Sequence, residues 1–469
     1  MPDYPGYYQY LTGGAAAPQE GECRIELAPE TLTVAPASAA PFTIDLGDLA
    51  GVAAANFQIR LPLDNGHTLV LKQLAKAYDR ISRDLLESYR RRAVQCLLLE
   101  DMEEIGRYPG AFERYPASAG CSSCGARNHG TKFCPECGAL VTGSAAPASV
   151  SGEAEICLYK TNLAVLPSGA QGFQWRLAEV DAVRGKPGSL DVTLESGDDR
   201  LRLYQLGRRT NEFAEAARTA IGAVNAHSAQ ALHATFPFLA PDQLQATAAL
   251  WREGRAASIA RLNAIHPRMG SSLAANAVDT DLKPYFEELV RRTATGMLYA
   301  GFKLIRPEEK ADAETPEESE TATPDGDETG PETLYWFFFP LAKQPGSPEP
   351  ANLVAWEASS RSGRATYFFR LVDPSQEKLL QDPKQAEALV DHAIRRLNRV
   401  LGMLNFRRRP IYLSDSELET NPLYRRYAIA CRRIPEVREV RASFVGRAIH
   451  VSPEAWLDQI NGLVAKADK

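Results

Sequence analysis

The chain has 469 residues, of which 44% are hydrophobic and 24% are charged, and its formal net charge is −6 at pH 7. This length corresponds to roughly three or four domains of ordinary globular composition, and the small net charge excludes a strong overall attraction to nucleic acid or acidic membranes. The sequence has no run of about 18 apolar residues and no signal peptide, so we expect a cytoplasmic protein without a transmembrane helix.

Residues 1–20 are rich in Tyr, Gly, Pro and Ala and have few aliphatic side chains. This composition predicts a flexible tail. The alternative is an aromatic segment that docks on a partner or a neighbouring subunit, because tyrosines offer large contact area at low entropic cost.

Residues 21–110 alternate polar and apolar side chains in short runs, for example at residues 31–34, 57–61 and 68–71. This alternation predicts antiparallel strands, with a hairpin turn at residues 64–66. Ile81, Leu85 and Tyr89 follow at helical spacing on one face. The sequence therefore predicts a small module of several strands closed by one helix.

Two Cys-x-x-Cys-Gly knuckles lie within residues 118–140, and they contain Cys121, Cys124, Cys134 and Cys137. Two facing knuckles make the closed tetrahedral thiolate site that structural zinc prefers. The knuckles and the run at residues 132–138 resemble the short zinc-ribbon family, which implies one structural Zn²⁺ per chain at these four cysteines. A redox dithiol and unliganded cysteines are the alternatives. Residues 141–152, rich in Ala, Ser, Gly and Pro, then predict a flexible linker.

Residues 153–230 repeat the pattern of residues 21–110, and apolar positions recur at nearly constant offsets through several strands and the closing helix. We interpret this as an internal duplication, because chance rarely preserves an offset over several strands. The order of strands and one C-terminal helix resembles the pleckstrin-homology-like (PH-like) fold, in the form of bacterial PH-like and GRAM-like domains. Another small β-barrel or roll is the alternative. The zinc ribbon is predicted to lie between the two copies.

Residues 236–292 show helical periodicity, and residues 293–469 predict a C-terminal α+β domain with an antiparallel sheet. Residues 307–332 are acidic and rich in Pro and Thr, which predicts a disordered insertion between two strands. The expected fold is therefore multidomain α+β, with a duplicated PH-like barrel or roll, a zinc ribbon and a C-terminal α+β domain.

The last domain is rich in arginine, whose guanidinium group favours bidentate contact with phosphate or carboxylate. Three interpretations stay open: a solvated face, an intramolecular partner for the acidic insertion, and a surface for nucleic acid or another anionic partner. The candidate contact residues are Arg395, Arg396, Arg399, Arg407, Arg408, Arg409, Arg425, Arg426, Arg432 and Arg433.

No nucleotide-binding, metalloprotease or serine-hydrolase motif occurs in the sequence, so we predict no catalytic residue. We expect a non-enzymatic zinc-ribbon adaptor or scaffold that mediates protein–protein interactions within a larger cytoplasmic complex, bacterial by its module type. The alternative is a nucleic-acid-associated protein that uses the Arg-rich C-terminal domain, for example in a bacterial defence or stress system. Membrane binding is not expected, because acidic residues balance the basic ones near the predicted turns of the second module.

Overall fold

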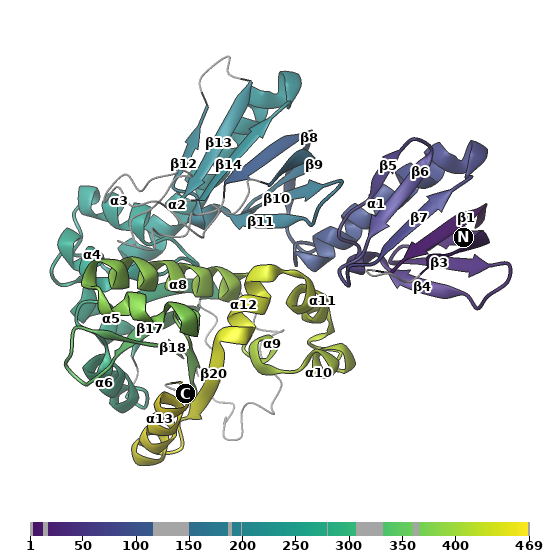
Figure 1. Cartoon of the computed structure of the whole chain (residues 1–469). Helices are drawn as coiled ribbons and strands as arrows, with labels where there is room; N and C mark the ends of the chain where they lie inside the picture. The colour runs from purple at the N-terminus through teal and green to yellow at the C-terminus, as the bar shows by residue number, and fades with distance from the viewer. Residues whose placement is uncertain are drawn as a thin grey trace. The chain divides into compact units, whose positions relative to one another are not determined.

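The computed structural model of the chain describes residues 3–12, 17–115, 150–185, 190–197, 199–278, 280–305, 332–359 and 365–467. The chain divides into two compact units. Of the described residues, unit 1 comprises those within 3–115, 150–220 and 413–438, and unit 2 comprises those within 221–412 and 439–467. The architecture is multidomain α+β with antiparallel sheets (Figure 1). The predicted zinc ribbon at residues 118–140, the linker up to residue 149 and the acidic residues 307–331 lie outside the described residues.

Module 1 is a curled seven-stranded sheet closed by one helix, and its strand order is β4-β3-β2-β1-β7-β6-β5. Ile25, Val34 and Ile59 are fully buried on its inner face, where they pack with Ile81 and Leu85 of the helix. Its elements are β1 (Asp3–Leu11), β2 (Gln19–Leu27), β3 (Thr31–Pro36), β4 (Phe42–Asp45), β5 (Ala53–Ala55), β6 (Gln58–Pro62), β7 (Thr68–Lys72) and α1 (Tyr78–Cys96).

Module 2 has the same strand order in its own sheet, β11-β10-β9-β8-β14-β13-β12, and is also followed by a helix. The chain thus contains two curled sheets of matching strand order, each followed by a helix, which is consistent with the predicted repeat. The elements are β8 (Glu104–Tyr115), β9 (Val150–Tyr159), β10 (Asn162–Pro167), β11 (Phe173–Arg176), β12 (Ala182–Arg184), β13 (Asp191–Ser196), β14 (Asp199–Tyr204) and α2 (Thr210–Thr235).

The prediction of a flexible tail at residues 1–20 is wrong for residues 3–11, because β1 is a central strand that pairs with both β2 and β7. Tyr4 and Tyr8 supply its buried surface, and each is 5% exposed. Aromatic rings thus take the place of the aliphatic side chains that the sequence pattern required. Pro5 and Gly6 also interrupt the alternation that marks a strand.

A matching strand begins module 2 and corrects the position of the zinc-ribbon segment. β8 begins within the range assigned to module 1, residues 21–110, yet it pairs with β9 and β14 of module 2. The register brings Arg114 opposite Val150, so residues 116–149 connect two adjacent strands of one sheet. The cysteine-containing segment is therefore an insertion within module 2 and does not lie between the modules.

Unit 2 is built around a six-stranded antiparallel sheet of order β15-β16-β17-β18-β19-β20. β15 belongs to the predicted helical segment and pairs with β16, so residues 236–292 share a unit with the C-terminal sheet. The strands are β15 (Ala257–Ser258), β16 (Tyr299–Ile305), β17 (Glu332–Ala342), β18 (Pro350–Ser359), β19 (Ala365–Phe369) and β20 (Phe444–Ile449).

Helices pack on this sheet around a core that includes Trp251, Phe302, Phe337 and Trp456. The predicted hairpin around the acidic segment is confirmed by its ends, because Ile305 pairs with Glu332. The helices are α3 (Pro241–Leu250), α4 (Ile259–Ile265), α5 (Met269–Ala277), α6 (Lys283–Arg292), α8 (Pro383–Met403), α9 (Arg409–Tyr412) and α13 (Pro453–Ala467).

Residues 413–438 belong to unit 1, although the sequence assigned them to the C-terminal domain. They contain α10 (Asp415–Thr420), α11 (Arg425–Arg433) and the first part of α12 (Pro435–Ser443). Their contacts with the two modules, described below, are the physical reason for this assignment. Among the described helices, none has the length and apolarity needed to cross a bilayer.

Candidate functional site

The two modules contact each other directly within unit 1, through the turn before β5 and the turn between β10 and β11. The Val52 backbone N–H donates to Ser168 O at 2.7 Å. At Gly51, a Cβ atom would lie only 2.7 Å from the carbonyl carbon of Gly169, so the two backbones approach too closely for a side chain. The hydroxyl of Tyr89 on α1 donates to the Ala170 carbonyl oxygen at 3.1 Å. These contacts fix the modules as a pair.

Helix α11 closes this junction, and its principal contact is a buried arginine. Arg433 is 4% exposed, donates from Nη2 to Leu49 O at 2.6 Å and forms an ion pair with Asp64 of module 1. Its own carbonyl oxygen accepts from Gln171 Nε2 of module 2 at 2.5 Å. Burial lowers the pKa of the Arg433 guanidinium to about 10, so the side chain stays charged at pH 7. One residue thus joins α11 to both modules.

The predicted arginine set is divided between the two units. In unit 2, Arg395 pairs with Asp391 at 2.9 Å, and Arg396 pairs with Glu439 at 3.1 Å. Arg408 is buried. Arg399 and Arg409 also make contacts within the chain, and Arg407 is half-buried. Several of these side chains therefore serve local packing and ion pairing.

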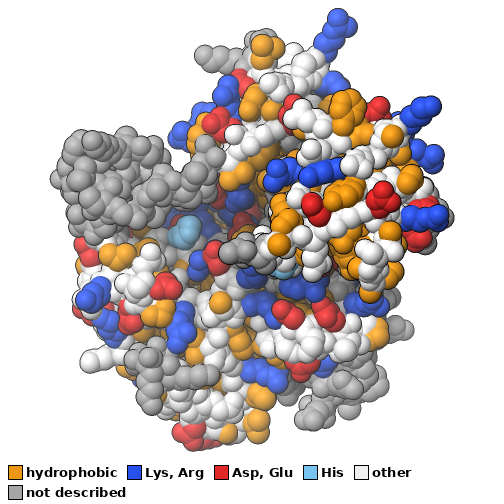
Figure 2. All heavy atoms as spheres, turned by 45° about the vertical axis from the view of Figure 1, so that its right-hand side comes forward, with side chains coloured by type: hydrophobic (Ala, Val, Ile, Leu, Met, Phe, Trp, Pro, Cys, Tyr) orange, Lys and Arg blue, Asp and Glu red, His pale blue; other side chains and the backbone are white. Residues whose placement is uncertain are grey.

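In unit 1, the remaining four arginines lie on or beside α11. Arg432 pairs with Asp48 at 3.4 Å and Glu419 at 2.6 Å, and Arg426 pairs with Asp101 at 3.3 Å. Arg425 is exposed. Figure 2 shows Lys and Arg side chains interspersed with Asp and Glu over the face that it presents. On that face no broad area is basic alone.

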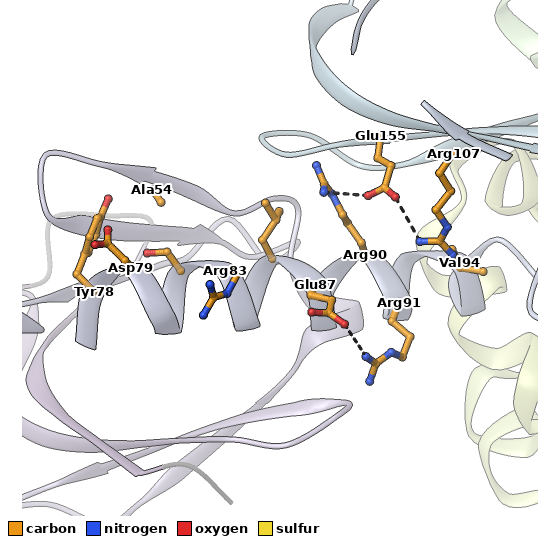
Figure 3. Close-up of a pocket in the computed structure, with 12 residues that line it drawn as sticks. Ala54, Tyr78, Asp79, Arg83, Glu87, Arg90, Arg91, Val94, Arg107 and Glu155 are labelled. Atoms are coloured by element: carbon orange, nitrogen blue, oxygen red, sulfur yellow. Dashed lines mark hydrogen bonds and ion pairs between the residues drawn. The ribbon is translucent and has the colours of Figure 1, made fainter. Parts of the chain in front are cut away.

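A groove of about 790 Å³ lies on α1 between the β5–β6 hairpin of module 1 and strands β8 and β9 of module 2 (Figure 3). One wall contains Ala54 of β5, and the other contains Arg107 and Glu155 of module 2. The outer face of α1 forms the floor, because the inner face is buried against its own sheet. The floor residues are Tyr78, Asp79, Ser82, Arg83, Leu86, Glu87, Arg90, Arg91 and Val94.

The groove combines apolar surface with four arginines and three carboxylates. Glu155 lies between Arg90, at 2.9 Å, and Arg107, at 3.3 Å. Arg107 also donates from Nε to Glu104 at 2.8 Å, and this bond raises the pKa of Arg107. The side chain of Arg83 is 74% exposed, and its ion pair with the adjacent Asp84 is long, at 3.6 Å. Arg83 is therefore available to an incoming acidic group.

Two shielded polar atoms on the groove floor have no hydrogen-bond partner among the described residues: Ser82 Oγ and Arg90 Nε. Buried polar atoms are normally paired, and leaving one unpaired costs about 1–3 kcal/mol. Both atoms are enclosed by protein, so a ligand in the groove does not reach them. The apolar and charged side chains that line the groove suit a ligand that carries both apolar and polar groups.

The zinc prediction at Cys121, Cys124, Cys134 and Cys137 falls outside the described residues. Within the described part of the chain, no group of three or more His, Cys, Asp and Glu side chains could hold a metal. The other four cysteines, Cys23, Cys96, Cys157 and Cys431, are buried. Burial raises the pKa of Cys96 and Cys157 to about 12 and that of Cys23 to about 11, so these thiols are neutral at pH 7 and unsuited to act as thiolate ligands or nucleophiles.

A buried polar cluster in unit 2 was missed by the sequence analysis. Glu357 Oε2 accepts from Thr366 Oγ1 at 2.6 Å and lies 3.2 Å from His450 Nε2, while Trp456 Nε1 donates to Thr366 Oγ1 at 3.0 Å. Glu357 and Thr366 have no exposed surface. The cluster joins β18, β19 and α13 inside the core, so it fits a role in packing better than contact with a substrate.

The sequence analysis also missed the groove, although the duplication contained a signal for it. Leu86 of α1 corresponds to Arg218 of α2 when Ile81 and Leu85 are matched with Phe213 and Ala217. Leu86 is half-buried against the core of module 1 and also lines the groove, whereas the copy has an arginine, so the two helices differ in use at this position. Comparison of the two copies could not predict the wall that module 2 contributes, nor the role of Arg433.

Comparisons with known proteins add a distant structural neighbour. No family model matches the chain, and no curated protein was found to match it. Among solved structures, the pleckstrin homology (PH) domain of USP37 is similar over 19% of this chain and 97% of that chain, at 13% sequence identity and a TM-score of 0.17. A match with this TM-score supports no conclusion about fold or function.

Proposed function

We propose that the chain is a non-enzymatic adaptor or scaffold, in which two PH-like modules held as a pair present the groove on α1 to a protein partner. The groove itself is the observation that carries this proposal, because it is bounded by both modules and combines apolar surface with charged side chains. The matching strand orders and closing helices support the PH-like assignment.

In this proposal, Cys121, Cys124, Cys134 and Cys137 hold one structural Zn²⁺. The two knuckles support this, because their spacing suits a closed tetrahedral site. The position of the insertion also supports it, since Arg114 and Val150 are direct partners and the ends of the insertion are neighbours. A metal-stapled unit can be inserted between such ends without separating the strands. The ribbon then forms a second docking element on module 2.

The test begins with affinity capture from the native host by the full chain, followed by purification of each captured protein. A purified partner should bind the full chain with defined stoichiometry in calorimetry, and the variant Leu86→Arg should weaken binding at least tenfold. This substitution places on α1 the arginine that α2 carries at the corresponding position. The variant Arg425→Ala, altered at an exposed residue outside the groove, is the control and should bind as the wild type does.

If none of the purified candidates binds the full chain in calorimetry, the adaptor function is refuted. Binding of duplex or single-stranded nucleic acid that falls steeply with salt, and that is lost when residues 407–409 are replaced by Ala, would instead establish the nucleic-acid alternative.

A further inference from the structure

One wall of the groove is the edge of a sheet, and among the described residues no backbone hydrogen-bond partner is found for Ala54 on the outer side of this edge. β5 is the last strand in the sheet of module 1. The hairpin turn at Asn56 and Phe57 has φ values of 52° and 57°, as in a two-residue type I′ turn. Ala55 and Gln58 flank the turn as a hydrogen-bonded pair, so the N–H and C=O of Ala54 point outward from the sheet.

The same edge already pairs with the backbone of another segment. The N–H of Val52, two residues before Ala54, donates to Ser168 O of module 2. Residues two apart in a strand direct their backbone groups to the same side. Ala54 therefore offers the next donor and acceptor along an edge whose first position is occupied. An extended chain that entered the groove would continue this pairing.

We propose, on the basis of the adaptor function above, that the groove binds an extended peptide segment with an acidic side chain, which pairs with Ala54 as an added strand. Strand addition supplies backbone hydrogen bonds, and side-chain pockets beside the edge supply specificity. Leu86 and Tyr78 contact the apolar side chains of the peptide. The small side chain of Ala54 leaves room for the peptide backbone.

The charges of the groove indicate where the acidic side chain of the peptide binds. Arg90 and Arg107 both pair with Glu155, and Arg107 pairs with Glu104 as well, so carboxylates of the chain balance these two guanidinium groups. Arg83 is largely exposed and shares Asp84 with Arg80, each at 3.6 Å, so two guanidinium groups have one carboxylate between them there. Guanidinium groups prefer carboxylate partners in a fork geometry. The peptide carboxylate thus binds beside Arg83, while Asp79 and Glu87 disfavour a second acidic residue near it.

The exposed end of the hairpin extends this surface. Phe57 is 77% exposed although it has a positive φ, which bulky residues rarely adopt. Its ring lies 5.4 Å from that of Tyr78, which lines the groove. An exposed aromatic residue in a strained turn lowers the stability of the fold. The presence of Phe57 is explained if its ring covers an apolar side chain of the bound peptide.

Module 2 provides an internal comparison, because its corresponding surface is occupied by a side chain. Arg218, at the position of Leu86, donates from Nη2 to the carbonyl oxygen of Gly185 at 3.1 Å. Gly185 directly follows the edge strand β12. The arginine therefore bridges the helix and the strand edge, where module 1 has an apolar residue and open space. Peptide binding is consequently assigned to module 1.

The experiment is a selection of random 12-residue peptides displayed on phage against the full chain, followed by fluorescence anisotropy with the enriched peptides. The enriched sequences should share an Asp or Glu beside apolar residues. Replacing that acid by its amide should weaken binding at least tenfold. The variants Leu86→Arg and Ala54→Pro should do the same, since proline removes the outward N–H.

Matched controls separate the groove from general surface effects. Leu190 of module 2 is also 77% exposed, so Leu190→Ser should leave affinity within twofold, whereas Phe57→Ser should lower it at least fivefold. Should Ala54→Pro unfold module 1, peptides with single backbone N-methyl groups replace it. One methylated position should then abolish binding to the wild-type chain, as strand pairing requires.

The inference is overturned if the selection yields no common sequence, if the enriched peptides lack an acidic residue, or if their binding ignores Leu86→Arg. In that case a purified protein partner that still binds the chain would leave the adaptor function intact and assign it to another surface. If neither a peptide nor a purified protein partner binds the chain, both the adaptor function and the peptide site are refuted.

Discussion

Removal of the buried guanidinium by Arg433→Met should release α11 from the two modules. The substitution deletes the ion pair with Asp64 and the bond to Leu49 O, a carbonyl on a residue with no exposed surface. A hydrogen bond to a charged group contributes about 1.5–3 kcal/mol, and the stranded carbonyl costs about 1–3 kcal/mol more. Asp64 is 44% exposed and regains water, so we expect a net loss of about 2–4 kcal/mol.

Hydrogen exchange measured by mass spectrometry tests this value locally. Opening of α11 should become easier, and amide protection at residues 425–438 should fall roughly 30- to 700-fold, since about 1.4 kcal/mol is a factor of ten. The control Arg425→Met changes an exposed residue of the same helix and should alter protection less than threefold. A loss below threefold for Arg433→Met, or equal losses for both variants, would show that α11 is held by other contacts.

Three further predictions concern packing, pH and metal. Gly110→Ala should destabilise unit 1 by about 1–3 kcal/mol in urea unfolding, because the added Cβ would lie 2.8 Å from Leu206. In the control Gly152→Ala, the nearest neighbour of the added Cβ is 3.9 Å away, so the free energy of unfolding should change by less than about 0.5 kcal/mol. Burial raises the pKa of the Cys96 thiol from 9.0 to about 12. The neutral buried thiol therefore contributes to the free energy of unfolding below pH 9, and this contribution is lost as the pH rises toward 12. Cys96→Ala should reduce the fall in unfolding midpoints between pH 8 and 10.5, and an unchanged slope would contradict this. Cys134→Ser should release one zinc per chain in elemental analysis while the circular dichroism of the modules is retained, and a native protein without zinc would refute the ribbon.

The first strand of each module shows how local patterns can hide a strand. β1 and β8 share the run Tyr-Pro-Gly, at residues 4–6 and 108–110. Proline and glycine suggest a turn, so neither run was predicted as a strand. The glycines are needed because a Cβ at Gly6 would meet Leu74 at 2.9 Å, as one at Gly110 would meet Leu206 at 2.8 Å. The repeated tripeptide was the available signal, and recognising it would have extended the duplication to both first strands.

The sequence by itself determined the elements whose order is set by short-range periodicity. Alternation at period two and the amphipathic stripe of Ile81, Leu85 and Tyr89 predicted the two copies of strands followed by a helix, since burial of one face must repeat with the geometry of the element. The spacing of the four cysteines similarly determined the zinc hypothesis, because ligand geometry is encoded within some twenty residues.

Only the tertiary structure decided which segments meet. No local pattern reveals that residues 116–149 interrupt a sheet, that residues 413–438 join unit 1, or that Arg433 is a buried anchor where the sequence offered an anion-binding arginine. The groove has the same origin, because its floor comes from α1 and its walls from Ala54, which precedes this helix in the chain, and from Arg107 and Glu155, which follow it. Such sites depend on contacts between segments distant in the chain, and these contacts leave no periodic trace in the amino-acid sequence.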